Sequence, residues 1–137
     1  MLMADFSTCV KYDLPVKVIV IKNNLLGQIR WEQMVLLGNP EYATYLEPID
    51  FAALARACGG TGYTIEEPSS CGDILDAALN APGPVIVQAL VDPNEPPMPA
   101  KITVNQAAKL VESLVRGQPY AGRIAYTIAE DKIREMI

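Results

Sequence analysis

One short apolar segment narrows the choice of folds for this chain more than any other part. Residues 16–22 read V-K-V-I-V-I-K, and Asn23 and Asn24 follow them directly. A run of this length, rich in β-branched side chains, predicts a strand buried on both faces. Open α/β sheets bind ligands at the carboxyl ends of their strands, which is where the asparagine pair lies. An amide oxygen there is a donor that Mg²⁺ or Ca²⁺ accepts.

Strands and helices alternate along the rest of the chain. Residues 85–91 form a second apolar run, V-I-V-Q-A-L-V, which predicts another strand buried on both faces, and residues 62–66 predict a shorter strand. Apolar spacing predicts helices at 2–12, 28–37, 51–58, around 74–79, to about 115 and at 120–137. This alternation predicts an α/β fold with a parallel sheet, joined by right-handed crossovers, and helices on both faces.

Local signals mark several helix ends. Asp50 is placed to cap the helix at 51–58, and Gly59-Gly60 ends it. Thr103 and Gln106 have the spacing of a capping box at the start of the helix that runs to about Val115. Residues 23–27 form a turn in which Gly27 is free to adopt a positive φ.

Composition excludes several classes of function. The chain has 137 residues, half of them hydrophobic, which is enough for one domain with a real core. A net charge of −5 and scattered basic residues argue against nucleic acid. With no His, a zinc site or a His-based triad is excluded, and three widely spaced cysteines indicate reduced thiols and a cytoplasmic location.

The residues alone leave the asparagine turn open to two interpretations. Asn23 and Asn24 can bind a metal ion, or they can merely satisfy backbone groups of the turn, as Asn commonly does. The helix at 28–37 is open in the same way. It can carry functional side chains, or it can combine core packing with a solvated charge.

A series of motifs follows in fixed order to about residue 103. The motifs read M-L-M-A-D-F, L-P-V-K-V-I-V, N-N-L-L-G-Q-I, W-E-Q, D-F-A-A-L-A-R-A-C-G, G-P-V-I-V-Q-A-L-V-D and P-P-M-P-A-K-I. This series resembles the thiamine diphosphate enzymes, in particular the C-terminal, diphosphate-binding domain of the pyruvate oxidase and acetolactate synthase family. The resemblance implies the thiamine diphosphate-binding fold over residues 1–103, and residues 104–137 are expected to form a helical extension.

The resemblance also implies Mg²⁺ shared between the protein and the cofactor's diphosphate. In that family an Asp from a Gly-Asp-Gly turn and a later Asn ligate the metal, together with one backbone carbonyl. Aligned on Gly27, Asn23 is the side-chain ligand and Leu25 the carbonyl donor, and Asn24 is the weaker candidate. Leu25, Leu26 and Gly27 would then lie at the cofactor.

The helix after the metal turn lines the substrate pocket in this family, and Gln28 and Glu32 match its two pocket positions. Some oxidases carry Glu at the second position, where acetolactate synthases typically carry Trp. Trp31 is one position away from it. Glu32 therefore favours a parent enzyme of the pyruvate oxidase kind, or a quinone-dependent pyruvate dehydrogenase, which decarboxylates pyruvate or a related 2-oxo acid. An acetolactate synthase is the alternative.

The chain departs from the family at its start. It has no Gly-Asp-Gly, and Asp5 lies inside the helix that normally follows that motif. We therefore expect a domain that lacks its first strand and depends on N-terminal domains or a second subunit, in a homo-oligomer. FAD would belong only to the full-length parent. Alone, this chain is expected to be inactive, and a non-catalytic remnant that serves as an interaction module is a further alternative.

Overall fold

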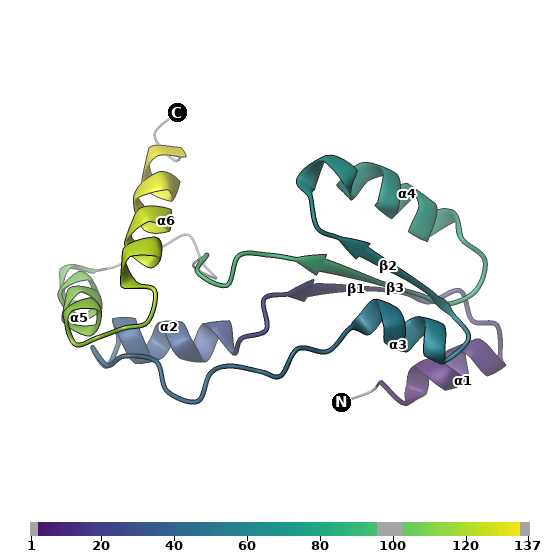
Figure 1. The fold of residues 1–137 in the computed structure, drawn as a ribbon, viewed down its shortest axis with the longest axis horizontal. Helices are drawn as coiled ribbons and strands as arrows, with labels where there is room; N and C mark the ends of the chain where they lie inside the picture. The colour runs from purple at the N-terminus through teal and green to yellow at the C-terminus, as the bar shows by residue number, and fades with distance from the viewer. Residues whose placement is uncertain (1–2, 96–102, 135–137) are drawn as a thin grey trace. The chain divides into compact units, whose positions relative to one another are not determined.

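The computed structural model describes residues 3–95 and 103–134, and the chain forms two compact units. The first unit consists of Met1–Lys22 and Pro48–Val91, and the second of Asn23–Glu47 and Asp92–Ile137. The first contains the sheet, and the second is built mainly from helices (Figure 1).

The sheet of the first unit is parallel, as predicted. Its strands are β1 (Lys17–Lys22), β2 (Thr61–Ile65) and β3 (Val85–Leu90), in the order β1-β3-β2. Val85 is in register with Lys17 on one side and with Thr61 on the other. The central strand β3 is buried at all of its first four residues, so the prediction of a strand buried on both faces is confirmed there.

Helices cover both faces of this sheet. The helical elements of the first unit are α1 (Asp5–Lys11), α3 (Phe51–Ala57), the 3₁₀ turn η1 (Pro68–Ser70) and α4 (Cys71–Asn80). Val85 and Val87 point to the face covered by α4, and Ile86 points to the opposite face, where it packs with Phe6 of α1 and Ala55 of α3 (Figure 1). Side chains alternate between the two faces along a strand, so the apolar side chains of β3 pack against the helices on both faces of the sheet. The expected three-layer α/β fold is confirmed.

The prediction that residues 16–22 form a strand buried on both faces is wrong. β1 forms at the expected place, but the side chains of Ile19 and Ile21 are 51% and 67% exposed. Within the described residues β1 pairs only with β3, and α4 packs over β2 and β3. Val20 points the other way and joins the core around Phe6. β-branched composition favours a strand, but its burial depends on which elements lie beside it.

The start of α3 is fixed by a polar network on the sheet. Asp50 caps the helix as predicted, with its carboxylate accepting from the Ala53 N–H at 2.9 Å. Gln88, buried in β3, donates to Asp50 and to Thr64, and its side-chain oxygen accepts from the Phe51 N–H. The network satisfies every polar atom of the buried Gln88 amide, which would otherwise cost free energy.

The second unit is built around three helices. They are α2 (Gly27–Val35), α5 (Val104–Val115) and α6 (Ala121–Arg134). Met34 and Val35 of α2 pack with Leu110 of α5 and Ile124 of α6, and Trp31 covers this core. The capping box of Thr103 is present as predicted. The helices from residue 104 onward thus pack on α2, and residues 135–137 of the expected last helix lie outside the described range.

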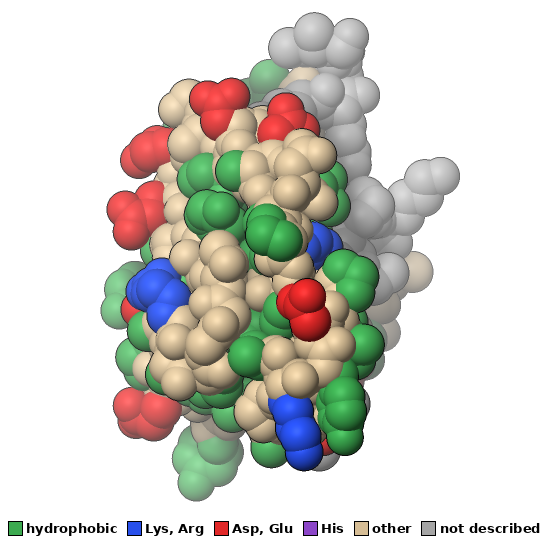
Figure 2. Space-filling view, turned by 90° about the vertical axis from the view of Figure 1, so that its right-hand side faces the viewer, with side chains coloured by type: hydrophobic (Ala, Val, Ile, Leu, Met, Phe, Trp, Pro, Cys, Tyr) green, Lys and Arg blue, Asp and Glu red, His purple; other side chains and the backbone are tan. Residues whose placement is uncertain are grey.

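No helix in the described part of the chain is both long and apolar enough to cross a membrane. Figure 2 shows one face of the molecule, on which most of the acidic side chains lie toward the top and the left edge, few basic ones are visible, and hydrophobic side chains are scattered between them.

Candidate functional site

The site expected from the sequence begins at the turn that follows β1, residues 23–26. Asn24 has a φ of 55°, a left-handed conformation that Asn adopts more readily than most residues. Gly27 does not supply the positive φ, and it is instead the first residue of α2. The chain therefore bends at Asn24 and enters the helix at Gly27.

A second segment, residues 41–46, holds this turn in place, and we call it the strap. The Leu26 N–H donates to the Thr44 carbonyl at 2.8 Å, and the Leu46 N–H donates to the Asn24 carbonyl at 2.9 Å. These two bonds flank an antiparallel bridge between Leu25 and Tyr45. In such a pair the two central residues direct their own N–H and C=O groups away from each other. The Leu25 carbonyl therefore points away from the strap.

The Asn23 side chain lies on that same side of the turn. Its amide oxygen accepts from the Leu25 N–H at 3.0 Å. A Cβ on residue 27 would lie 3.2 Å from the Asn23 amide nitrogen, so glycine leaves room for this amide. The turn thus places the Asn23 oxygen and the Leu25 carbonyl on the same side, whereas the Asn24 carbonyl accepts a hydrogen bond from the strap.

The donor set suits a hard cation that finds its other ligands elsewhere. An amide oxygen keeps a second lone pair after it accepts one hydrogen bond, and a backbone carbonyl has two. Within the described residues no cluster of three or more Cys, Asp or Glu could hold a metal ion. Two neutral oxygens fit Mg²⁺ that completes its octahedral shell with phosphate oxygens and water.

The two predicted pocket residues lie on the exposed side of α2. Gln28 donates to the Glu32 carboxylate at 3.1 Å, as residues one helical turn apart can. Trp31 and Met34 face the core of the second unit. Gln28 and Glu32 are therefore neighbours on the solvent-exposed side of α2, away from the side that packs against the core of the second unit.

One buried charge of α2 escaped the sequence analysis. Arg30 is 5% exposed and forms an ion pair with Glu41 of the strap. Its guanidinium also donates to the Pro93 carbonyl at 2.9 Å and to the Asn94 side chain at 3.1 Å. The spacing of residues in the sequence could have indicated that Arg30 is buried, because Arg30 lies one helical turn before the apolar Met34 and so shares its side of α2.

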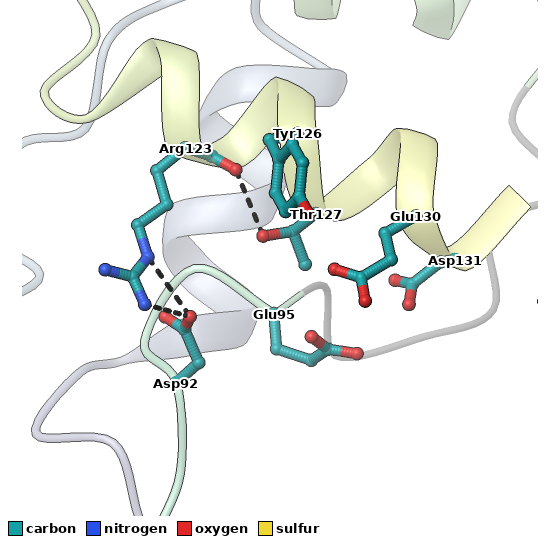
Figure 3. A pocket seen from close by; sticks show the side chains of 7 residues that line it. All are labelled: Asp92, Glu95, Arg123, Tyr126, Thr127, Glu130 and Asp131. Carbon is teal, nitrogen blue, oxygen red and sulfur yellow. Dashed lines mark hydrogen bonds and ion pairs between the residues drawn. The ribbon is translucent and has the colours of Figure 1, made fainter. Parts of the chain in front are cut away.

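Two cavities lie in the second unit, and one of them is lined by part of this cluster. A cavity of about 500 Å³ is lined by Arg30, Tyr45, Asp92, Pro93, Asn94, Tyr120 and Arg123. A second, of about 450 Å³, is lined by Asp92, Glu95, Arg123, Tyr126, Thr127, Glu130 and Asp131 (Figure 3).

Asp92 and Arg123 are common to both cavities, and the Arg123 guanidinium donates to the Asp92 carboxylate at 2.9 and 3.2 Å. The Asn94 backbone N–H, and then Arg123, hold the pKa of Asp92 below its usual value. Neither cavity is lined by Asn23, Gln28 or Glu32.

Comparison with known proteins gives this geometry its context. Residues 1–89 match the family model described as thiamine pyrophosphate enzyme, C-terminal TPP binding domain. The chain belongs to this family. Thiamine pyrophosphate is the same compound as thiamine diphosphate, so the resemblance noted in the sequence is confirmed.

Curated relatives agree with this thiamine pyrophosphate-binding domain. YdaP of Bacillus subtilis (strain 168), whose name describes it as thiamine pyrophosphate-containing, is 41% identical over 78% of the chain and 18% of its own length. The acetolactate synthase large subunit of Pyropia yezoensis is 34% identical over 68% of the chain and 16% of its own length. The large subunit of acetolactate synthase isozyme 2 of Escherichia coli (strain K12) is 29% identical over 64% of the chain and 16% of its own length. The matched segments thus span less than a fifth of these relatives.

Proposed function

We propose that this thiamine diphosphate-binding domain holds the cofactor and Mg²⁺ in an enzyme that decarboxylates pyruvate or a related 2-oxo acid. The observation that carries the proposal is the turn after β1, where the Asn23 amide oxygen and the Leu25 carbonyl lie on one side. The chain belongs to a family of thiamine pyrophosphate-binding domains, and the turn offers two hard oxygen donors. A Mg²⁺ ion that is shared with a diphosphate takes ligands of this kind from the protein.

Each residue of the site has a specific role in this proposal. Asn23 and Leu25 hold the metal, and the backbone of Leu26 and Gly27 lies against the cofactor. The cofactor, when bound, supplies the electron sink for loss of CO₂. Gln28 donates to one oxygen of the Glu32 carboxylate, which leaves the other oxygen for a substrate or its proton.

Glu32 supports a pyruvate oxidase or a quinone-dependent pyruvate dehydrogenase as the parent enzyme. In the family resemblance this pocket position carries Glu in some oxidases and typically Trp in acetolactate synthases. The second candidate is an acetolactate synthase, which the names of several relatives favour. We further propose a homo-oligomer with additional N-terminal domains, FAD in the parent only, and a cytoplasmic location.

Product analysis separates the candidates. The full-length natural protein is incubated with pyruvate, thiamine diphosphate, Mg²⁺ and either a quinone or FAD. Acetate and CO₂, with one reduced acceptor per pyruvate consumed, support the proposal. Acetolactate and CO₂ without reduction of the acceptor support the synthase instead. Absence of turnover together with absence of cofactor binding would indicate a non-catalytic module and reject both enzyme assignments.

A further inference from the structure

We propose that the buried Arg30–Glu41 ion pair positions the metal-binding turn relative to the pocket helix α2. This inference rests on the proposed function, because it concerns how the same site is held in shape. Both residues are argued to act through their neighbours, so they are positioning residues rather than catalytic ones.

The strap makes contact with the turn through its backbone and through Tyr45. Its two backbone hydrogen bonds with Asn24 and Leu26 fix the turn on either side of Leu25. Tyr45 lies directly opposite Leu25 in the bridge. A displacement of the strap would therefore displace the Leu25 carbonyl, since the bonds on both sides of that residue would move with it.

The same strap is fastened to α2. Gln33 donates to the Tyr42 carbonyl at 3.1 Å and accepts from the Tyr42 N–H at 2.8 Å. Glu41 pairs with Arg30, and the side chains are only 3% and 6% exposed, respectively. The strap thus connects the turn to the helix that carries Gln28 and Glu32.

The Arg30–Glu41 ion pair is the buried, charged part of the connection between the strap and α2. The second oxygen of Glu41 accepts from the Tyr45 hydroxyl at 2.8 Å. Burial, and then this hydrogen bond to Glu41, raises the pKa of Tyr45. Arg30 is held from the other side by Pro93 and Asn94. A continuous series of contacts therefore runs from Arg30 through Glu41 and Tyr45 to Leu25.

Stability alone does not account well for such a pair. A buried ion pair loses much of its Coulombic gain to desolvation, and apolar replacement of both partners is often neutral or stabilising. Mg²⁺, by contrast, demands nearly ideal octahedral geometry, and loss of groups that orient its ligands typically lowers affinity by about 10- to 100-fold. An experiment can therefore separate the effect of the ion pair on Mg²⁺ affinity from its effect on the stability of the fold.

The test uses the full-length natural protein with Arg30→Met, Glu41→Leu and the double variant. Calorimetric titration with Mg²⁺ and thiamine diphosphate gives the affinity, and a thermal melt gives the stability. We expect each single variant to melt at a lower temperature, because one buried charge is left unpaired. The double variant should recover most of the melting temperature but still bind Mg²⁺ about tenfold or more weakly.

Two milder variants complete the design. Tyr45→Phe removes only the hydrogen bond to Glu41 from a side chain that is 57% exposed, so it should fold and lose a smaller share of the Mg²⁺ affinity. Tyr126→Phe is the control, because it removes the same hydroxyl from a tyrosine of α6 that is 68% exposed and lies outside the strap. Its affinity should match that of the unmodified protein.

The outcomes distinguish this inference from the proposed function. If the unmodified protein binds Mg²⁺ and thiamine diphosphate and the double variant and Tyr45→Phe bind them equally well, the positioning role is rejected and the proposed function stands. If the double variant fails to fold, the comparison of Tyr45→Phe with Tyr126→Phe decides the matter in the same way. If the unmodified protein binds neither compound, both are rejected.

Discussion

The side-chain oxygen of Asn23 accepts a hydrogen bond from the backbone N–H of Leu25 at 3.0 Å. This hydrogen bond satisfies a backbone N–H of the turn. It also places the Asn23 amide oxygen on the side to which the Leu25 carbonyl points. The two interpretations of the asparagine pair are therefore compatible, because an amide oxygen can accept one hydrogen bond and still offer a lone pair to a cation.

Asn23→Ala should weaken Mg²⁺-dependent binding of thiamine diphosphate by about tenfold or more, since a direct ligand matters at least as much as the groups that orient it. The matched control is Asn24→Gly, which keeps the positive φ of that position and removes only its side chain. Titration calorimetry on both variants tests this. Equal loss of affinity in the two would show that the turn, and not the Asn23 oxygen, is what matters.

Glu32→Gln keeps the shape of the side chain but removes its charge and its capacity to take a proton. We expect kcat with pyruvate to fall by about 100-fold, within the range typical of a lost acid–base group. Cofactor affinity should not change, because Glu32 lies more than one helical turn beyond the proposed metal-binding turn. Steady-state kinetics and cofactor titration measure the two effects, with the exposed Glu66→Gln as the control. An unchanged kcat would remove Glu32 from the proposed mechanism.

Gly62→Ala should be one of the most destabilising small substitutions in the first unit. A Cβ at this position of β2 would overlap the backbone carbonyl of Ala52 in α3, and backbone cannot rotate out of the way. We expect a loss of about 3 kcal/mol in the free energy of unfolding. Gly72→Ala is the control, since nothing lies near its Cβ position in α4 and the change should stabilise by about 0.5 kcal/mol. Urea denaturation of both variants checks the difference.

The cap of α3 should make stability depend on pH. The Ala53 backbone N–H, with Arg56 and Gln88, lowers the pKa of Asp50 below the model-compound value of 3.8. The ionised form is therefore favoured in the folded protein, so its contribution is present above pH 3.8 and is lost as the pH falls below it. Asp50→Asn keeps a capping oxygen but cannot titrate.

Thermal melts of the Asp50 variant and the unmodified protein should converge as the pH is lowered through this range. If the melting temperatures of the two proteins instead change in parallel down to pH 2, the Asp50 cap is not the source of the pH dependence of stability.

The exposed face of β1 should promote self-association of the chain. Ile19 and Ile21 are both more than half exposed on one side of a strand that pairs only with β3 among the described residues. Unpaired apolar edges of this kind associate readily. Replacing both by Thr, which retains β propensity, should lower the apparent mass in concentration-dependent light scattering. Val115→Thr, a change at an even more exposed side chain in α5, should have no effect.

Local signals predicted most of the helices and strands. The caps at Asp50 and Thr103 depend on side chains that bond to backbone only three residues away, so their spacing in the sequence is sufficient to find them. The pairing of Gln28 with Glu32 is equally local, because residues four apart meet on a helix. Asn23 and Leu25, by contrast, were predicted as ligands only through the family resemblance, by alignment on Gly27.

The tertiary structure decided the features that depend on distant neighbours. β1 and β3 are both rich in β-branched apolar residues, yet β3 is buried because it is the central strand and helices α3 and α4 pack over its two faces, whereas β1 lies at an edge of the described sheet, beyond α4. The Arg30–Glu41 pair likewise joins residues that no local pattern connects. Hydrophobic periodicity and capping report interactions within a few residues. Burial and charge pairing are set by whichever parts of the chain meet in space, and those contacts exist only after folding.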